Sequence, residues 1–264
     1  MLQESDIISV PVQKKDFFAV SGESHRGLLR KKNEDNFSLV RYSTGDRLLV
    51  VVADGIGGHS RGEMASYICC RELTCAFMKK AGKLDSPEEA AKFLQSELER
   101  INEAIYLRNR SNRSLRRPMG TTVNCAVFLG DSVVMGNAGD SRLYEFSQDE
   151  SVRQLSTDHS FKAALAAEGV ETHRHGLGNV IYRAVGLHRN FELELKTFSI
   201  APGNRYLLCT DGMYRSLEDQ HIAQIIRHAA SPSQALNEFM RSALIAGGSD
   251  NITGIAVFVP GDQK

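Results

Sequence analysis

The order of the expected secondary-structure elements constrains the fold of this chain more than any other feature of its sequence. Short apolar or alternating runs, which predict strands, lie at residues 17–21, 36–42, 47–53, 121–129, 132–136, 142–146, 192–198, 205–210 and 254–259. Helical patterns separate groups of these strands, at residues 61–80, 86–108, 161–168, 218–229 and 233–246. Because strands and helices do not alternate one by one, the sequence favours antiparallel α+β layers over a doubly wound parallel sheet.

The domain organisation is expected to be simple. The chain has 264 residues, of which 42% are apolar, so it can bury a substantial core. Residues 1–16 show no periodicity and are expected to form a loose lead-in. Residues 17–264 contain no internal repeat and no low-complexity linker, so we expect them to form one domain.

Composition argues against several function classes. Lys and Arg together number 32, as do Asp and Glu, so no net charge favours nucleic acid or an anionic membrane. The longest apolar runs have the length of strands and are far too short to span a membrane. The N-terminus has two acids and no basic segment, which favours a cytoplasmic protein without a signal peptide. The five cysteines form no C-x-x-C pair and are best explained as buried reduced thiols.

Four aspartates lie where an apolar strand ends or a turn begins. Asp54 and Asp211 each follow a buried run and precede a glycine, whereas Asp35 and Asp250 lie in polar segments. They are scattered over most of the chain, so only a folded core could bring them together. A cluster of oxygen ligands with almost no nitrogen or sulfur suits Mg²⁺ or Mn²⁺ better than zinc or copper.

The two Asp-Gly pairs have a plainer alternative, because this dipeptide on its own usually indicates a turn. A hairpin turn is disfavoured here, since each pair follows a buried strand and leads into Gly-rich or helical sequence. Glycine at such a position lets a metal ion or a phosphate approach the backbone closely. The Gly-rich segment 55–62 does not fit a dinucleotide-binding loop, because His59 or Ser60 stands where the G-x-G-x-x-G spacing needs glycine.

Further motifs occur in order along the chain: Arg30-x-x-Asn33-Glu34-Asp35, Asp54-Gly55-Ile56-Gly57-Gly58-His59, Gly120-Thr121-Thr122, Gly139-Asp140-Ser141-Arg142, Thr157-Asp158-His159-Ser160 and Val180-Ile181-Tyr182-Arg183-Ala184. With the Asp211 and Asp250 segments, this set resembles the bacterial-type metal-dependent protein serine/threonine phosphatases, the protein phosphatase 2C family. The resemblance covers residues 21–259, nearly the whole chain. It implies a four-layer αββα sandwich, two antiparallel β-sheets flanked by helical layers, with a metal site at one end.

The resemblance also implies that two Mn²⁺ or Mg²⁺ ions share one set of oxygen ligands: Glu34, Asp35, Asp54, the Gly55 carbonyl, Asp211 and Asp250. Asp54 would bridge the ions. Asp211 and Asp250 would hold one ion, and Asp35 the other, with Glu34 acting partly through water. Sparse protein ligation that leaves several waters in place is how both metals prefer to bind.

The resemblance implies roles for three other residues, and two of these residues, Asp140 and His59, also have a structural alternative. Asp140 matches a position that helps to hold a weaker third ion in bacterial relatives; alternatively it bonds backbone amides in a turn or pairs with Arg142. Arg30 matches the arginine that clamps the substrate phosphate, for which the guanidinium fork is suited. His59 is the candidate general acid for the leaving alkoxide; alternatively its ring bonds the backbone of its own loop.

The function implied by the resemblance is hydrolysis of phosphoserine and phosphothreonine by direct attack of a hydroxide that bridges the two ions. The expected partners are phosphoproteins, in particular a bacterial Ser/Thr kinase and its substrates, and the chain is expected to act as a monomer. A flap over the site, at about residues 160–179, is shorter than in bacterial relatives. The alternative is a noncatalytic relative that serves as a binding or scaffold module, which the presence of all four aspartates disfavours.

Overall fold

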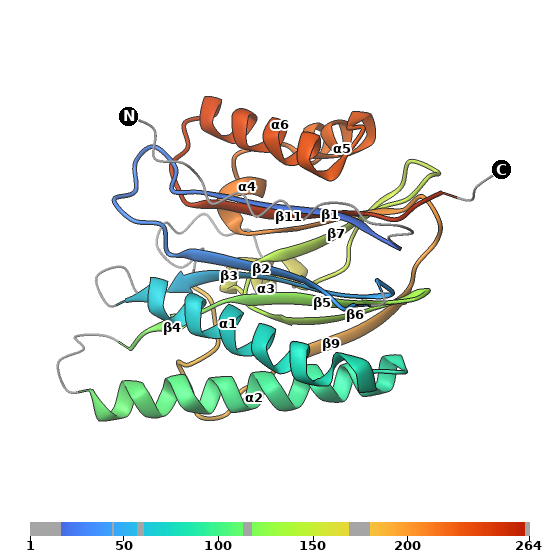
Figure 1. The fold of residues 1–264 in the computed structure, drawn as a ribbon. Coiled ribbons are helices and arrows are strands. Elements are labelled where there is room, and N and C mark those ends of the chain that lie inside the picture. Colours follow the sequence, from blue (N-terminus) through green and yellow to red (C-terminus); the bar gives the residue numbers. More distant parts are fainter. Residues whose placement is uncertain (1–16, 44, 57–60, 113–117, 169–179, 262–264) are drawn as a thin grey trace.

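The computed structural model describes residues 17–43, 45–56, 61–112, 118–168 and 180–261. Two antiparallel sheets lie face to face, and helices cover both outer faces (Figure 1). This arrangement confirms the predicted four-layer αββα sandwich of the α+β class. The lead-in predicted at residues 1–16, and most of the predicted flap, fall outside the described residues.

The first sheet has five strands in the order β1-β11-β10-β7-β8. Their bounds are β1 (Ala19–His25), β7 (Arg142–Phe146), β8 (Val152–Gln154), β10 (Arg205–Cys209) and β11 (Ile252–Phe258). The first and the last strand of the chain pair along their whole length, from Ala19 opposite Phe258 to His25 opposite Ile252. The two ends of the described chain are therefore held together in one sheet.

The second sheet has six strands, five of them in the order β2-β3-β5-β6-β9, with β4 paired to β3. Their bounds are β2 (Asp35–Arg41), β3 (Arg47–Ile56), β4 (Gly120–Thr121), β5 (Val123–Leu129), β6 (Ser132–Ala138) and β9 (Glu194–Ser199). The short connections along β2-β3 and β5-β6 are hairpins, as expected of antiparallel neighbours.

Helices α1 (Gly62–Lys80) and α2 (Pro87–Ser111) cover the second sheet, joined by the short 3-10 helix η2 (Ala81–Lys83). Helices α4 (Asp211–Tyr214), α5 (Asp219–His228) and α6 (Pro232–Ile245) cover the first sheet (Figure 1). Helix α3 (Phe161–Ala167) follows β8. The predicted start of α2 is confirmed, because the Ser86 side chain accepts a hydrogen bond from the Glu89 amide, with proline at the first turn. No helix in the described ranges has the length and apolar character needed to cross a membrane.

Strand β3 explains why the sequence between Arg47 and Asp54 is continuously apolar. Successive side chains of a strand point to opposite faces, and here both faces are covered. Leu49, Val51 and Ala53 pack under α1 and α2, whereas Leu48, Val50 and Val52 face the other sheet. All six are fully buried. The interior between the sheets also contains Phe18, Phe128, Tyr206 and Leu208.

Most predicted elements are confirmed to within a few residues, and the differences have local causes. The strand predicted at 17–21 lies instead at Ala19–His25, because its position is set by pairing with β11. The strand predicted at 121–129 is split into β4 and β5, which pair with different parts of β3. Strand β8 and helix α4 were not predicted: β8 is exposed throughout and α4 has four residues.

The cysteines are free thiols. Cys69, Cys70, Cys125 and Cys209 are buried, as predicted, whereas Cys75 is exposed, so the prediction was wrong for this residue. Burial raises the pKa of Cys69 well above its ordinary value and that of Cys125 to about 12, so neither thiol ionises readily. The described structure thus gives the buried cysteines no role as nucleophiles.

Candidate metal centre

The four aspartates of the sequence meet at one end of the sandwich. Asp35, the first residue of β2, is the register partner of Asp54 on β3. Asp211 lies two residues after the end of β10, as the first residue of α4, and Asp250 precedes β11 by two residues. Because the end of β10 lies beside the start of β11, these two pairs of strands place all four residues at the same edge. Asp140 lies in the turn between β6 and β7, where the chain crosses from one sheet to the other.

The electrostatics of Asp54 show that these side chains share one environment. Burial raises the pKa of Asp54 well above its ordinary value, and the charges of Asp35, Asp211, Asp140 and Asp250 raise it further. Each nearby negative charge disfavours ionisation of the next. The site is therefore defined by five carboxylates that repel one another, of which Asp35 and Asp140 are buried.

The Asp35 carboxylate is buried and only half bonded. Its Oδ2 accepts a hydrogen bond from the Thr210 hydroxyl at 2.8 Å, whereas its Oδ1 has no hydrogen-bond partner. Burial raises the Asp35 pKa, with further contributions from the charges of Asp211 and Asp250. A buried carboxylate oxygen without a donor is costly unless something positive approaches it.

The backbone of Asp54 is held by the Gly120-Thr121-Thr122 motif. The Asp54 amide donates to the Thr122 hydroxyl at 2.9 Å, and the Asp54 carbonyl accepts from the Thr121 hydroxyl at 2.9 Å and from the Thr122 amide at 2.8 Å. Three hydrogen bonds therefore fix where the Asp54 side chain leaves the strand. Such fixed ligands reduce the ordering cost of binding an ion.

Glycine is required next to Asp54 because the chain passes very close to Gly55. A side chain on Gly55 would place its Cβ 2.4 Å from the Gly62 carbonyl carbon and 2.7 Å from the Glu34 carbonyl oxygen. The Gly55 amide donates to that Glu34 carbonyl, as does the Ser66 hydroxyl. This close packing joins Glu34, Gly55 and the start of α1 into one corner of the site.

Two arginines pair with three of the five carboxylates. Arg30 Nη2 lies 2.8 Å from Asp250 Oδ2. Arg215 Nη1 lies 2.9 Å from Asp211 Oδ2, and its Nη2 lies 3.0 Å from Asp140 Oδ2. Burial raises the pKa of Asp140 to about 6, and the charge of Arg215 acts in the opposite direction.

The donor set fits a pair of hard divalent ions. Among the predicted ligands, three buried carboxylate oxygens have no hydrogen-bond partner: Glu34 Oε1, Asp35 Oδ1 and Asp140 Oδ1. In the described ranges, no group of three or more His, Cys, Asp or Glu side chains already has the spacing of a chelated ion, and Arg30 and Arg215 occupy some of the oxygens instead. Oxygen ligands that are buried, unpaired and mutually repelling are what Mg²⁺ and Mn²⁺ would relieve.

The predicted site residues are thus largely brought together. Glu34, Asp35, Asp54, Gly55, Asp140, Asp211, Asp250 and Arg30 all belong to this end of the molecule. His59 lies outside the described residues, so its role stays a prediction. The specific role of each ligand also stays a prediction.

Sequence reasoning missed three residues that build the site. Thr210 bonds Asp35, and Arg215 bonds two aspartates. Asn251 holds the loop between β1 and β2: its Oδ1 accepts from the Glu34 amide, and its Nδ2 donates to the carbonyls of Arg26 and Lys32. The sequence signal for two of them was their position: Thr210 directly follows β10, and Asn251 directly precedes β11.

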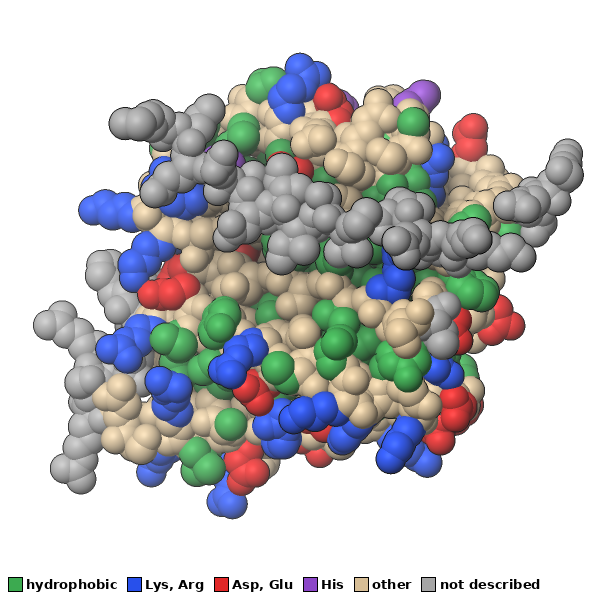
Figure 2. All heavy atoms as spheres, in the orientation of Figure 1, with side chains coloured by type: hydrophobic (Ala, Val, Ile, Leu, Met, Phe, Trp, Pro, Cys, Tyr) green, Lys and Arg blue, Asp and Glu red, His purple; other side chains and the backbone are tan. Residues whose placement is uncertain are grey.

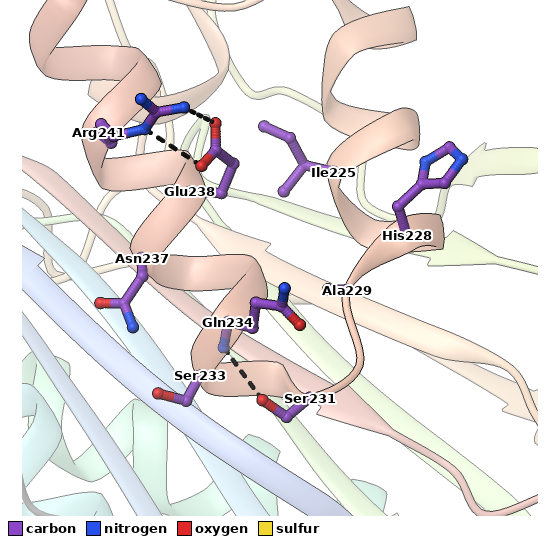
Figure 3. A pocket seen from close by; sticks show the side chains of 9 residues that line it. All are labelled: Ile225, His228, Ala229, Ser231, Ser233, Gln234, Asn237, Glu238 and Arg241. Atoms are coloured by element: carbon purple, nitrogen blue, oxygen red, sulfur yellow. Dashed lines mark hydrogen bonds and ion pairs between the residues drawn. The ribbon is translucent and has the colours of Figure 1, made fainter.

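A hollow elsewhere on the molecule lacks the features of a second candidate site. About 530 Å³ of space lies between α5 and α6, and the side chains around it include His228, Gln234, Glu238 and Arg241 (Figure 3). Its charged pair, Glu238 with Arg241, is satisfied internally and exposed. None of the residues lining it has a buried side-chain atom without a hydrogen-bond partner, in contrast to the carboxylate end. On the face in Figure 2, basic and acidic side chains of the described residues are interspersed.

Comparison with known proteins agrees with the geometry. The model of the protein phosphatase 2C family matches residues 22–244. The chain belongs to this family. The predicted family and the predicted class of enzyme, a protein phosphatase, are thereby confirmed.

Individual relatives match over nearly the whole chain. The serine/threonine phosphatase stp of Listeria welshimeri is 33% identical over 236 residues, which is 88% of this chain and 92% of that protein. The serine/threonine protein phosphatase PstP of Mycobacterium tuberculosis is 31% identical over 248 residues, 90% of this chain and 44% of that protein.

Solved structures give the same family likeness. A bacterial serine phosphatase superposes with a TM-score of 0.85 at 29% identity, covering 93% of this chain and 99% of that one. The catalytic domain of PstP in complex with two manganese ions superposes with a TM-score of 0.77 at 29% identity, covering 92% and 98%.

Proposed function

We propose that this member of the protein phosphatase 2C family hydrolyses phosphoserine and phosphothreonine in proteins, using two Mn²⁺ or Mg²⁺ ions. The observation that carries the proposal is the convergence of five aspartate carboxylates. Two of them, Asp35 and Asp140, and the neighbouring Glu34 each have a buried oxygen without a hydrogen-bond donor. The manganese complex of PstP, a relative of the same fold, supports the choice of metal.

The residues that would hold the ions are those of the carboxylate end. Asp54 would be a ligand shared by the two ions, with the Gly55 carbonyl as a further ligand. Asp211 and Asp250 would hold one ion, and Asp35, with Glu34 partly through water, would hold the other. When bound, such ions activate a water for attack on phosphorus and neutralise charge on the phosphate. Thr121, Thr122, Thr210 and Asn251 would keep these ligands in place through the hydrogen bonds described above.

Arg30 would receive the substrate phosphate. Its side chain is 48% exposed and lies beside Asp250, on a loop that Asn251 holds in place. A guanidinium can donate two parallel hydrogen bonds to phosphate oxygens, which fixes the orientation of the monoester. His59 would then supply a proton to the serine or threonine oxygen as it leaves.

The substrates would be phosphoproteins, since the relatives are named serine/threonine phosphatases. A Ser/Thr kinase of the same cell and the proteins it modifies are the natural candidates. We propose that residues 17–264 act as one catalytic domain, as a monomer and in the cytoplasm, with the segment at about 160–179 as a short flap.

The test is hydrolysis of p-nitrophenyl phosphate and of a phosphothreonine peptide by the full chain, with Mn²⁺, with Mg²⁺ and with excess chelator. Both substrates should be hydrolysed with metal and not with chelator. Asp211→Asn should abolish turnover, whereas Asp149→Asn, at an exposed turn, should not. Turnover that survives complete chelation would contradict the proposed function.

A further inference from the structure

Arg215 joins two carboxylates that come from different parts of the sandwich. It follows α4, one helical turn after Asp211, and its side chain reaches back to that residue with Nη1 2.9 Å from Asp211 Oδ2. Its Nη2 lies 3.0 Å from Oδ2 of Asp140, in the turn between β6 and β7. One guanidinium therefore bridges the β10-α4 corner and the point where the chain crosses between the sheets.

The two carboxylates are far more buried than the arginine that pairs with them. The side chains of Asp140 and Asp211 are 3% and 13% exposed, compared with 38% for Arg215. The cation thus approaches from the solvent side and covers the carboxylates. A guanidinium presents five N–H donors in one plane, so it can serve two carboxylates at once, which an ammonium group does less well.

The neighbouring contacts make Arg215, rather than Arg142, the cation of Asp140. Arg142 is engaged with Asp158, to which it donates at 2.7 Å, and its guanidinium lies 3.7 Å above the Tyr214 ring. The Tyr214 hydroxyl donates to the Asp140 carbonyl at 3.0 Å, which holds the turn against α4. Asp140 therefore faces Arg215 in a fixed position, with its Oδ1 left unbonded.

We propose that Arg215 is a built-in cation of this site, which takes the position between Asp140 and Asp211 that a weaker third ion would need. The chain would then bind two Mn²⁺ ions and exclude one at Asp140. This inference rests on the proposed function, because it assumes that the carboxylates other than Asp140, with Asp211 among them, hold the pair of ions. An ion that bound both Asp140 and Asp211 would have to displace a guanidinium bonded to both, so the two cations compete.

The experiment counts Mn²⁺ ions bound to the full chain, by calorimetric titration and by the electron paramagnetic resonance signal of free Mn²⁺. The wild type should saturate at two ions. Arg215→Ala should bind an additional ion at least about tenfold more tightly than any further binding to the wild type, because a competing cation has been removed. Arg215→Lys, which keeps the charge but loses the fork, should lie between them. Arg241→Ala, which removes an exposed arginine paired with Glu238, should match the wild type.

Thermal unfolding gives a readout that does not depend on turnover. In chelator, Arg215→Ala should melt below the wild type, since two buried carboxylates lose their cation. Added Mn²⁺ should then raise its melting temperature more than it raises that of the wild type, because the ion replaces the lost charge. The Arg241→Ala control should show neither effect.

The outcomes separate this inference from the proposed function. Two ions in both the wild type and Arg215→Ala, with equal affinity, would overturn the role of Arg215 alone. Three ions in the wild type would overturn it as well. If Arg215→Ala does not fold, the ion count of the wild type and of Arg215→Lys decides the matter. No Mn²⁺ binding by the wild type would overturn the proposed function and this inference together.

Discussion

The space between the two sheets and the carboxylate end of the same sandwich are built on opposite rules. Between the sheets, Leu48, Val50, Phe128 and Leu208 are fully buried and apolar. At the carboxylate end, Asp35 and Asp140 are nearly as buried, yet each has a carboxylate oxygen with no hydrogen-bond partner. The first region is arranged for stability, and the second keeps unfavourable charges that only a cation can offset.

The comparison has a simple structural basis. Strand register brings the interior side chains into layers, and the same register brings the ends of β3, β10 and β11 to one edge. A rigid, well-packed sandwich can thus hold like charges close together at its end. We infer that the stability of the packed interior offsets the repulsion between the carboxylates at the end of the sandwich.

The largest expected effect is on turnover. Asp54→Asn removes the central carboxylate of the cluster, and losing several kcal/mol of metal-dependent stabilisation should lower the rate by about 10³-fold or more. The same change should raise the melting temperature of the chelated protein, because it relieves repulsion from Asp35 and Asp211. Rate assays and calorimetry on one preparation measure both. A variant that is inactive because it is unfolded would contradict this account of Asp54.

The next effect tests the interior. Leu208→Ala removes a fully buried side chain between the sheets and should reduce the free energy of unfolding by about 2–5 kcal/mol. The number of Mn²⁺ ions bound and the metal dependence of turnover should not change, since Leu208 belongs to the apolar cluster between the sheets. Denaturant unfolding and ion counting check the two halves of the prediction. If folded Leu208→Ala binds a different number of Mn²⁺ ions from the wild type, the interior and the carboxylate end do not behave independently.

The smallest effect is a pH dependence of stability. Burial raises the pKa of Asp140 from 3.8 to about 6, so in this window the folded chain holds a proton that the unfolded chain has released. Stability in chelator should therefore decrease as pH rises from about 4 to about 7, and Asp140→Asn should make the decrease shallower. Asp149→Asn is the control: hydrogen bonding by Ser151 lowers the Asp149 pKa, so its contribution has the opposite sign. The measurement is the melting temperature in chelator across this pH range. If it falls equally with pH in the wild type and in Asp140→Asn, the Asp140 pKa is not raised.

Much of the fold could be predicted from the sequence, because buried strands and capped helices leave strong local signals. The apolar run of β3 and the Ser86-Pro87 start of α2 are examples. Strand β8 could not be predicted, because its exposed residues Val152–Gln154 gain their strand conformation from pairing with β7. The exact position of β1 likewise depends on a partner more than 200 residues away in the chain, as set by the register with β11.

The site was only partly accessible from the sequence. Asp54 and Asp211 were found because they follow buried strands, and the family resemblance supplied their grouping with Asp35 and Asp250. Arg215 was not found, because an arginine four residues after an aspartate is commonly an exposed helix pair, and its second partner, Asp140, comes from a distant turn. Asn251 was missed for the same reason: its three hydrogen bonds reach a loop at the other end of the sequence.

The most direct test of the central claim is the anomalous diffraction of crystals grown with Mn²⁺. The account predicts two strong peaks at the carboxylate end, both in direct contact with Asp54 and shared among Asp35, Asp211 and Asp250. No third peak should lie between Asp140 and Asp211. Peaks bound elsewhere in the molecule, with the four aspartates left unligated, would contradict the claim that this end of the sandwich is a metal centre.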